Sequence, residues 1–264
     1  MISTERGTEV LGALAGKIGL VLGIANEHSI AAGCAQSFAG AGATLVATYL
    51  NEKAKPFVEA ATRDMPCALL LPCDVREPGS LEAVFDAVRT RYGRLDFVLH
   101  AVAFAPRDDL HGRVTDCSAA GFAMAMDVSC HSFIRTARLA EPLMKGGGTL
   151  LAVTFYGSER VVAHYNLMGP VKAALESSVR YLAAELGPAH IRTHALSPGP
   201  IRTRAASGID RFDEMLARAA AEAPEHEGVT IGEVGSLAAF LVSDAARMLN
   251  GTVIPVDGGQ HVMA

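Results

Sequence analysis

Residues 17–31 read KIGLVLGIANEHSIA, and this stretch decides the fold. A run of apolar, strand-forming residues ends at Gly23, a polar turn follows, and an uncharged alanine-rich segment begins near Ser29. This order predicts a buried β-strand, a tight turn and a helix that begins near Ser29. The stretch is therefore typical of the first half of a β-α-β unit.

The same alternation of strand and helix patterns runs along the rest of the chain. Short apolar runs suited to strands occupy residues 17–23, 44–49, 68–72, 95–101, 149–154, 191–196 and 252–256. Longer patterns suited to helices occupy residues 29–40, 52–63, 79–92, 118–144, 166–186, 205–221 and 231–243. Alternation of this kind predicts right-handed crossovers and a parallel sheet, and strands that are apolar throughout predict helices on both of its faces. We therefore expect a single α/β domain over residues 1–264, with a core at 16–259. Its fold is expected to be of the Rossmann type, a doubly wound parallel sheet of about seven strands.

The composition restricts the chain to a few classes of protein. It has 264 residues, half of them apolar, with 26 glycines and a net charge of −5. The apolar content excludes a disordered chain, and glycine without a period of three excludes collagen. The mild net acidity argues against a nucleic-acid partner, because such binders concentrate Lys and Arg.

The sequence also bears on compartment and membrane. The five cysteines form no C-x-x-C pair, which is typical of a reducing cytosol. Residues 1–16 lack the basic start and apolar middle of a signal peptide. Residues 29–50 carry no charge and are long enough to span a bilayer, but glycines at 40 and 42 divide them. We read this run as a helix and then a strand, and we expect a cytoplasmic protein with no membrane partner.

In a doubly wound sheet, ligands bind at the carboxyl ends of the strands, where the strand order switches. The ends of the first, fourth, fifth and sixth expected strands therefore surround one cleft. At the first of these ends, Gly23 lets the backbone approach a pyrophosphate, and the next helix offers free N–H groups. Ser29 either caps this helix, contacts phosphate, or does both. The turn lacks the pattern G-x-G-x-x-G, so an ordinary strand-to-helix turn is the alternative.

The ends of the second and third strands bear on the choice of dinucleotide. Many NAD enzymes place an acid after the second strand, and NADP enzymes place a basic residue there. Leu50 and Asn51 are neither. Lys53 and Lys55 are expected on the next helix and in solvent, which favours NADH over NADPH. After the third strand, Asp74 either accepts a hydrogen bond from an adenine amino group or caps the following helix.

Tyr165 and Lys172 are seven residues apart along an expected helix. Seven residues make about two turns, so both side chains are expected on one face. An ammonium ion beside a phenol lowers the pKa of the phenol and can also hold ribose hydroxyls. The alternative is an ordinary amphipathic helix with a solvated lysine.

After the sixth expected strand, residues 196–203 read LSPGPIRT, whose prolines and glycine predict a rigid turn. An apolar stripe at helical spacing follows, made of Ala205, Ile209, Phe212 and Met215. Such a stripe more often belongs to a core. The turn and Gly208 leave room for a movable lid, which we place at residues 200–222.

Five motifs in fixed order carry a resemblance to a known family. They are Gly23-x5-Ser29-Ile30-Ala31, Cys73-Asp74-Val75, Tyr165-Asn166-x-Met168-Gly169-x-x-Lys172, Gly199-Pro200-Ile201-x-Thr203-x-Ala205-Ala206-Ser207-Gly208-Ile209 and Val256-Asp257-Gly258-Gly259. Over residues 16–259 the chain resembles the bacterial enoyl-acyl-carrier-protein reductases, a divergent branch of the short-chain dehydrogenases/reductases. The resemblance implies NADH-dependent reduction of a trans-2-enoyl thioester on acyl carrier protein, in type II fatty-acid synthesis, by a homotetramer.

The resemblance also implies roles for individual residues. Tyr165 is implied to hydrogen-bond the thioester oxygen as negative charge builds there, and Lys172 to hold the nicotinamide ribose. Cofactor contacts are implied at Gly23, Ser29, Ile30, Asp74, Val75, Val102, Lys172, Ile201, Arg202, Thr203, Arg204 and Ala205. The acyl pocket is implied to contain Ala103, Ala105, Phe155, Met168, Ala205, Ile209, Phe212 and Met215, which makes the apolar stripe a pocket wall.

The chain departs from the family pattern near this pocket. Members often have a tyrosine ten residues before the catalytic tyrosine, where this chain has Phe155 followed by Tyr156. Adjacent strand residues face opposite ways, so either Phe155 closes the pocket or the strand end shifts. Three arginines that border the expected lid either contact an acidic carrier protein or face solvent: Arg202, Arg204 and Arg211.

Two other functions are alternatives to the reductase. A short-chain dehydrogenase that acts on a carbonyl or alcohol usually has a serine thirteen residues before its tyrosine, and Ala152 argues against it. A non-catalytic dinucleotide sensor has no need of both Tyr165 and Lys172. His190 and His194 have the spacing of a helical metal pair, but on a strand they are about 13 Å apart, so no metal is expected.

Overall fold

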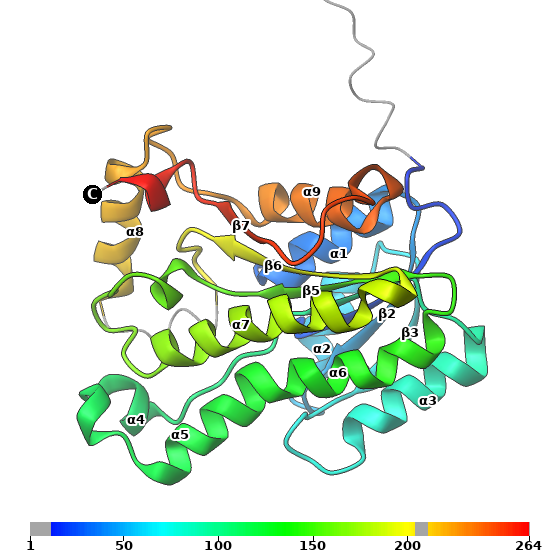
Figure 1. Ribbon diagram of the computed structural model, residues 1–264, viewed down its shortest axis with the longest axis horizontal. Coiled ribbons are helices and arrows are strands. Elements are labelled where there is room, and N and C mark those ends of the chain that lie inside the picture. The colour runs from blue at the N-terminus through cyan, green and yellow to red at the C-terminus, as the bar shows by residue number, and fades with distance from the viewer. Residues whose placement is uncertain (1–11, 204–210, 264) are drawn as a thin grey trace, which may run out of the picture.

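The computed structural model describes residues 12–203 and 211–263. Within these ranges, seven parallel strands form one sheet in the order β3-β2-β1-β4-β5-β6-β7 (Figure 1). They are β1 (Ile18–Leu22), β2 (Thr44–Tyr49), β3 (Cys67–Pro72), β4 (Phe97–His100), β5 (Gly148–Val153), β6 (Ile191–Pro198) and β7 (Val253–Val256). The strand order switches between β1 and β4, and the doubly wound fold expected from the sequence is confirmed.

Helices connect the strands, as the sequence predicts. They are α1 (Ile30–Gly40), α2 (Lys55–Thr62), α3 (Ser80–Tyr92), α4 (Arg107–His111), α5 (Ala119–Met126), α6 (Ser132–Ala140), α7 (Met168–Leu186), α8 (Phe212–Glu222) and α9 (Ile231–Val242). The expected helix at 118–144 consists of α5, a π-helical segment (Asp127–His131) and α6 in succession. The short helix α4 is absent from the sequence prediction.

Some of the expected helix starts are wrong. α7 begins at Met168 and not at residue 166, because His164 and Asn166 adopt φ angles of 65° and 39°. α8 begins at Phe212, after Arg211 with a φ angle of 55°, and the expected start at residue 205 lies outside the described residues. A residue in the left-handed region cannot continue a right-handed helix.

Two layers of helices cover the sheet (Figure 1). α3, α6 and α7 pack on one face, and α1, α2 and α9 pack on the other. Side chains alternate along each strand, so Val98 of β4 joins the first of these cores while Phe97 and Leu99 join the second. Because both faces are covered, all three are buried, which explains why the strands are mostly apolar.

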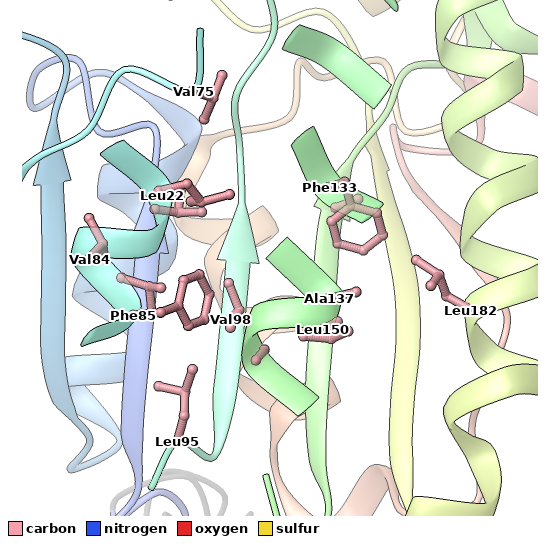
Figure 2. Packing of buried hydrophobic residues seen from close by; sticks show 14 of the residues in the cluster. Leu22, Val75, Val84, Phe85, Leu95, Val98, Phe133, Ala137, Leu150 and Leu182 are labelled. Atoms are coloured by element: carbon pink, nitrogen blue, oxygen red, sulfur yellow. The ribbon is translucent and has the colours of Figure 1, made fainter. Parts of the chain in front are cut away.

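Figure 2 shows the core between the sheet and the layer of α3, α6 and α7. Phe85 of α3 lies beside Val98 of β4, and Ala137 of α6 lies over Leu150 of β5. Leu182 of α7 belongs to the same cluster. This packing holds α6 and α7 at fixed positions against β4 and β5, and therefore positions the side chains at the carboxyl ends of those strands.

None of the helices within the described ranges combines the length and the apolar character needed to cross a bilayer. The uncharged run at residues 29–50 contains α1 and β2, as the sequence predicts.

The two helices of the second layer, α1 and α9, approach each other through glycines. A Cβ on Gly33 of α1 would lie 2.4 Å from the carbonyl oxygen of Ile231. A Cβ on Gly235 of α9 would lie 2.5 Å from the carbonyl oxygen of Gly33. The contact between these helices therefore depends on the absence of side chains at both positions.

We expect Gly33→Ala to separate α1 from α9 and to lower the free energy of unfolding by more than about 1 kcal/mol, because the core is overpacked. Gly40→Ala is the matched control, since Gly40 ends the same helix with open space around its Cα. Alanine favours the helix, so this control is expected to be as stable as the wild type or slightly more stable. Urea unfolding measures both variants, and equal stabilities would contradict the prediction.

Candidate active site

A cleft with a volume of about 880 Å³ opens along the carboxyl ends of the strands. Its walls come from the segments that follow β1, β4, β5 and β6, as the strand order predicts, and also from those that follow β2 and β3. Most of the predicted site residues line it: Gly23, Ser29, Ile30, Asp74, Val75, Val102, Ala103, Ala105, Phe155, Tyr165, Met168, Lys172, Ile201, Thr203 and Phe212.

The other predicted residues lie elsewhere or outside the described residues. Arg202 is an exposed residue that pairs with Asp213 of α8 at 2.6 Å. Met215 packs against the cluster of Phe155, Tyr165 and Met168 behind the cleft wall. Arg204, Ala205 and Ile209 lie outside the described residues.

Gly23, in the turn after β1, lies close to the backbone that follows β4, and its expected approach to a pyrophosphate stays a prediction. Its φ angle is +101°, and a Cβ would lie 2.3 Å from the carbonyl oxygen of Ala101, which follows β4. The Ser29 hydroxyl caps α1: it donates to the Asn26 carbonyl oxygen at 2.7 Å and accepts from the Ala32 N–H at 3.3 Å. Ser29 also lines the cleft, so the N-terminus of α1 faces it. A glycine cradle at a helix N-terminus suits the pyrophosphate of a dinucleotide.

Asp74 does not cap the next helix. Its carboxylate accepts hydrogen bonds from Arg76, with an Oδ2–Nη2 distance of 2.6 Å, and these bonds lower the pKa of Asp74. Gly79 is the N-cap residue of α3, and the Asp74 N–H donates to the Ser80 hydroxyl. Asp74 therefore presents a carboxylate to the cleft that is already paired with an arginine.

Several residues of the cleft were not among the predicted site residues, and a lysine, an arginine and a phenylalanine are examples. Lys53 lines the cleft from the turn before α2; it is exposed, as expected, but it does not lie on the helix. Arg76 lines it too, with its guanidinium 5.6 Å from the ring centre of Phe104, which also lines the cleft. All three follow the carboxyl ends of strands, and that position is the signal that could have identified them.

Tyr165 lies in the turn before α7, so the prediction that it shares a helix face with Lys172 is wrong. Its neighbour Asn166 has a positive φ angle and donates from its side-chain amide to the Leu110 carbonyl oxygen of α4 at 2.8 Å. This bond holds the turn against α4. The side chains of Tyr165 and Lys172 nevertheless enter the same cleft.

Phe155 closes the cleft beside Tyr165. It continues β5 in extended conformation, and its ring centre lies 4.8 Å from that of Tyr165 and 4.6 Å from that of Tyr156. Tyr156 is half-buried outside the cleft lining, and burial together with the nearby Glu222 carboxylate raises its pKa. Of the two alternatives, the structure has Phe155 in the pocket wall.

The lysine of the site is buried, not solvated. Lys172 is 5% exposed and donates from Nζ to the Val153 carbonyl oxygen at 2.7 Å. Burial lowers the pKa of Lys172 to about 8. Burial also raises the pKa of Tyr165 well above its ordinary value, contrary to the lowering expected from a nearby ammonium. At neutral pH the site therefore holds a protonated phenol and a charged ammonium.

His100 supports the site from the end of β4. It is 1% exposed, and its Nε2 lies 2.7 Å from the Ser132 hydroxyl, which donates to the Val128 carbonyl oxygen. Nε2 therefore carries the proton and donates to Ser132. Burial and the charge of Lys172 lower the pKa of His100 to about 3, so the ring is neutral.

His190 and His194, for which no shared metal was expected despite their spacing, lie in different settings. His190 precedes β6 with a φ angle of 59°, and His194 is buried within that strand. Among residues 12–203 and 211–263, no cluster of three or more His, Cys, Asp or Glu side chains is arranged to hold a metal ion.

Comparison with known proteins gives a consistent result. Residues 23–261 match the family model described as Enoyl-(Acyl carrier protein) reductase. An enoyl-acyl-carrier-protein reductase (NADH) of Rhizobium meliloti is 45% identical over 251 residues, which cover 95% of this chain and 94% of that protein. A reductase of the same description from Nostoc sp. is 44% identical over 253 residues, which cover 95% of this chain and 98% of that one.

Solved structures agree with these sequence matches. The reductase of Anaplasma phagocytophilum in complex with NAD has a TM-score of 0.92 at 42% identity, covering 96% of this chain and 97% of that one. The Bacillus cereus reductase with NADP⁺ and an indole naphthyridinone has a TM-score of 0.94 at 42% identity, covering 96% of this chain and all of that one.

The burial of Lys172 predicts a pH dependence of stability. Its pKa is about 8 in the folded protein and 10.5 when unperturbed, so the unfolded chain binds more protons between these values. The wild type should therefore gain stability relative to Lys172→Met as the pH rises from about 8 to about 10.5. Urea unfolding of both proteins across this range measures the difference. If the free energies of unfolding of the two proteins changed in parallel with pH, the lowered pKa of Lys172 would be contradicted.

Proposed function

The chain belongs to the enoyl-acyl-carrier-protein reductase family, and from this premise we propose that Tyr165 and Lys172 carry its chemistry. The protein is an oxidoreductase that uses NADH to reduce the double bond of an enoyl thioester carried on acyl carrier protein, a step of fatty-acid biosynthesis. The proposed roles rest on one observation: a protonated tyrosine and a charged, buried lysine line the same cleft.

NADH supplies the hydride, and the residues of the cleft suit its pyrophosphate and its nicotinamide ribose. Gly23 and the first turn of α1 suit the pyrophosphate. Lys172 suits the hydroxyls of the nicotinamide ribose as an ammonium donor. We assign the remaining contacts with the cofactor to residues around the same cleft, together with the segment after β6: Ser29, Ile30, Asp74, Val75, Val102, Ile201, Arg202, Thr203, Arg204 and Ala205.

Tyr165 provides a hydrogen bond where negative charge develops. Addition of hydride at the β-carbon of the substrate places negative charge on the thioester oxygen. A neutral phenol donates to that oxygen, and its donor strength counts for more in a buried, apolar site than in water. The raised pKa of Tyr165 therefore suits a donor, since a tyrosinate has no proton to give.

The apolar end of the cleft suits the acyl chain. Its proposed walls are Ala103, Ala105, Phe155, Met168, Ile209, Phe212 and Met215. We propose that residues 200–222 form the substrate-binding lid of a single dinucleotide-binding domain over residues 1–264. Arg202 and Arg211 at its border are paired with Asp213 and Glu214, which reduces the positive charge they offer to an acidic carrier.

An enzyme that acts on a carbonyl or alcohol is the second candidate, and Ala152 opposes it. The position where such enzymes carry a serine is here a buried alanine in β5 without a hydroxyl. No hydroxyl at this position is available to orient a carbonyl oxygen.

We expect the purified protein to oxidise NADH when given crotonyl or longer enoyl thioesters, with a weaker response to NADPH. Loss of NADH absorbance measures the reaction, run with both dinucleotides in parallel. Tyr165→Phe should lower kcat about 100-fold or more with little change in NADH affinity, because it removes only a donor to the developing charge.

Tyr156→Phe is the matched control for this variant, because Tyr156 adjoins Phe155 but does not line the cleft. It should retain wild-type turnover. Absence of NADH oxidation with every chain length would overturn the function. Equal losses of turnover and NADH affinity in Tyr165→Phe would overturn the role of Tyr165.

We also propose a cytoplasmic homotetramer. Large apolar side chains are exposed on the layer of α5 to α7, at Phe122, Met124, Ile134 and Tyr181, and on the opposite layer at Phe240 of α9. Two apolar surfaces on opposite faces suit two kinds of two-fold contact. The described cysteines are all free thiols, which suits a reducing compartment.

Light scattering should therefore give a particle of four 27.6 kDa chains. Phe122→Lys should yield smaller assemblies, because it places a charge in one of the apolar surfaces. Val161→Lys is the control, since Val161 is fully exposed in a loop outside both surfaces. A monomeric wild type would contradict the proposal.

A further inference from the structure

A second charged residue is buried directly behind the lysine of the cleft. Glu176 lies four residues after Lys172 on α7, so both side chains occupy one face of the helix. The exposed fraction is 5% for Lys172 and 3% for Glu176. Burying two opposite charges in one region costs desolvation energy, which their mutual attraction offsets only in part. We therefore ask what this arrangement contributes to the chemistry of the cleft.

Two hydrogen bonds fasten this face of α7 to the end of β5. Lys172 Nζ donates to the Val153 carbonyl oxygen at 2.7 Å, and the Thr154 hydroxyl donates to Glu176 Oε1 at 2.6 Å. Thr154 is itself 3% exposed, and its backbone N–H donates to the Leu196 carbonyl oxygen of β6. Val153 and Thr154 of the cleft wall are thus hydrogen-bonded to Lys172 and Glu176, which lie on consecutive turns of α7.

Three titratable groups interact electrostatically with Lys172, and a fourth lines the same cleft. The three are His100 of β4, Cys130 of the π-helical segment and Glu176 of α7, and the fourth is Tyr165 before α7. His100 is neutral at physiological pH. Burial raises the pKa of Tyr165 and of the Cys130 thiol, which keeps both protonated. Among these four groups, Glu176 is the one that offers a negative charge to the ammonium.

The same carboxylate affects both residues of the proposed chemistry. Its charge raises the pKa of Lys172, which opposes the effect of burial, and it also raises the pKa of Tyr165. Both effects favour the protonated forms. A donor to a developing negative charge and an ammonium for ribose hydroxyls require these forms.

We propose that Glu176 is a positioning residue for the reduction, held by Thr154, whose buried charge keeps Lys172 an ammonium ion at the cleft. The inference rests on the proposed roles of Tyr165 and Lys172. Glu176 acts through Lys172 and makes no contact with substrate or cofactor. Thr154 fixes its carboxylate, so the distance between the two charges is set by β5 as well as by α7.

The decisive variant is Glu176→Gln, which keeps an oxygen to accept from Thr154 and removes the charge. The readouts are kcat/KM for NADH and the Kd of NADH by fluorescence titration, each across pH 6 to about 10. In the wild type, kcat/KM should fall and the Kd of NADH should rise above about pH 8, as Lys172 loses its proton. In Glu176→Gln the midpoint should move to lower pH by about one unit, the usual effect of losing one nearby opposite charge.

Glu185→Gln is the matched control, because Glu185 lies on the exposed side of the same helix. It should keep the wild-type midpoint, and thermal unfolding shows that both variants remain folded. A Glu176→Gln midpoint equal to that of Glu185→Gln overturns the inference. The Kd titration separates this proposal from the proposed function. A wild-type protein that binds NADH but reduces no enoyl thioester would refute the function. The midpoint of the pH dependence of the NADH Kd would still test the role of Glu176.

Thr154→Val and Thr154→Ser give a second test that does not depend on Glu176→Gln folding. Valine removes the hydroxyl and frees the carboxylate, so the midpoint should move in the same direction by a smaller amount. Serine restores the donor and should restore the wild-type midpoint. Equal midpoints for the valine variant and the wild type overturn the role of Thr154 in holding Glu176.

Discussion

Burial of the sheet on both faces is the constraint on which the rest of the molecule depends. Helices α1, α2 and α9 cover one face and α3, α6 and α7 the other, so each central strand contributes apolar side chains to two cores. A polar group within such a strand would be buried without a partner. Chemistry is therefore confined to the edge where the parallel strands end, and all six segments that line the cleft meet there.

At this edge, polar groups are buried in pairs. Lys172 meets a backbone carbonyl, Thr154 meets Glu176, and His100 meets Ser132. Each hydrogen bond joins a strand end to a helix of the α3, α6 and α7 layer. The positions of the charges are therefore set by the packing shown in Figure 2, since a shift of α6 or α7 would break these bonds.

Burial also determines which forms of the acid–base groups are present. It holds Tyr165 protonated and brings the pKa of Lys172 down to about 8, still charged at neutral pH. An exposed tyrosine and lysine would have ordinary pKa values and would donate more weakly because water competes. The proposed reductase chemistry thus uses two groups of one cleft, and burial shifts their pKa values in opposite directions.

The amino-acid sequence alone determined the strands and their parallel arrangement, because the hydrophobic period is a local property. Strand-end positions and the family resemblance together identified part of the cleft lining. The sequence did not determine that Tyr165 precedes α7, since the turn is held by a bond from Asn166 to Leu110, fifty-six residues away. It gave no sign that Lys53 and Arg76 line the cleft, nor that Thr154 holds Glu176 behind Lys172. These features depend on contacts between segments far apart in the chain. Burial sets the protonation states of Tyr165 and Lys172, and these residues become buried only when the helices pack on the sheet.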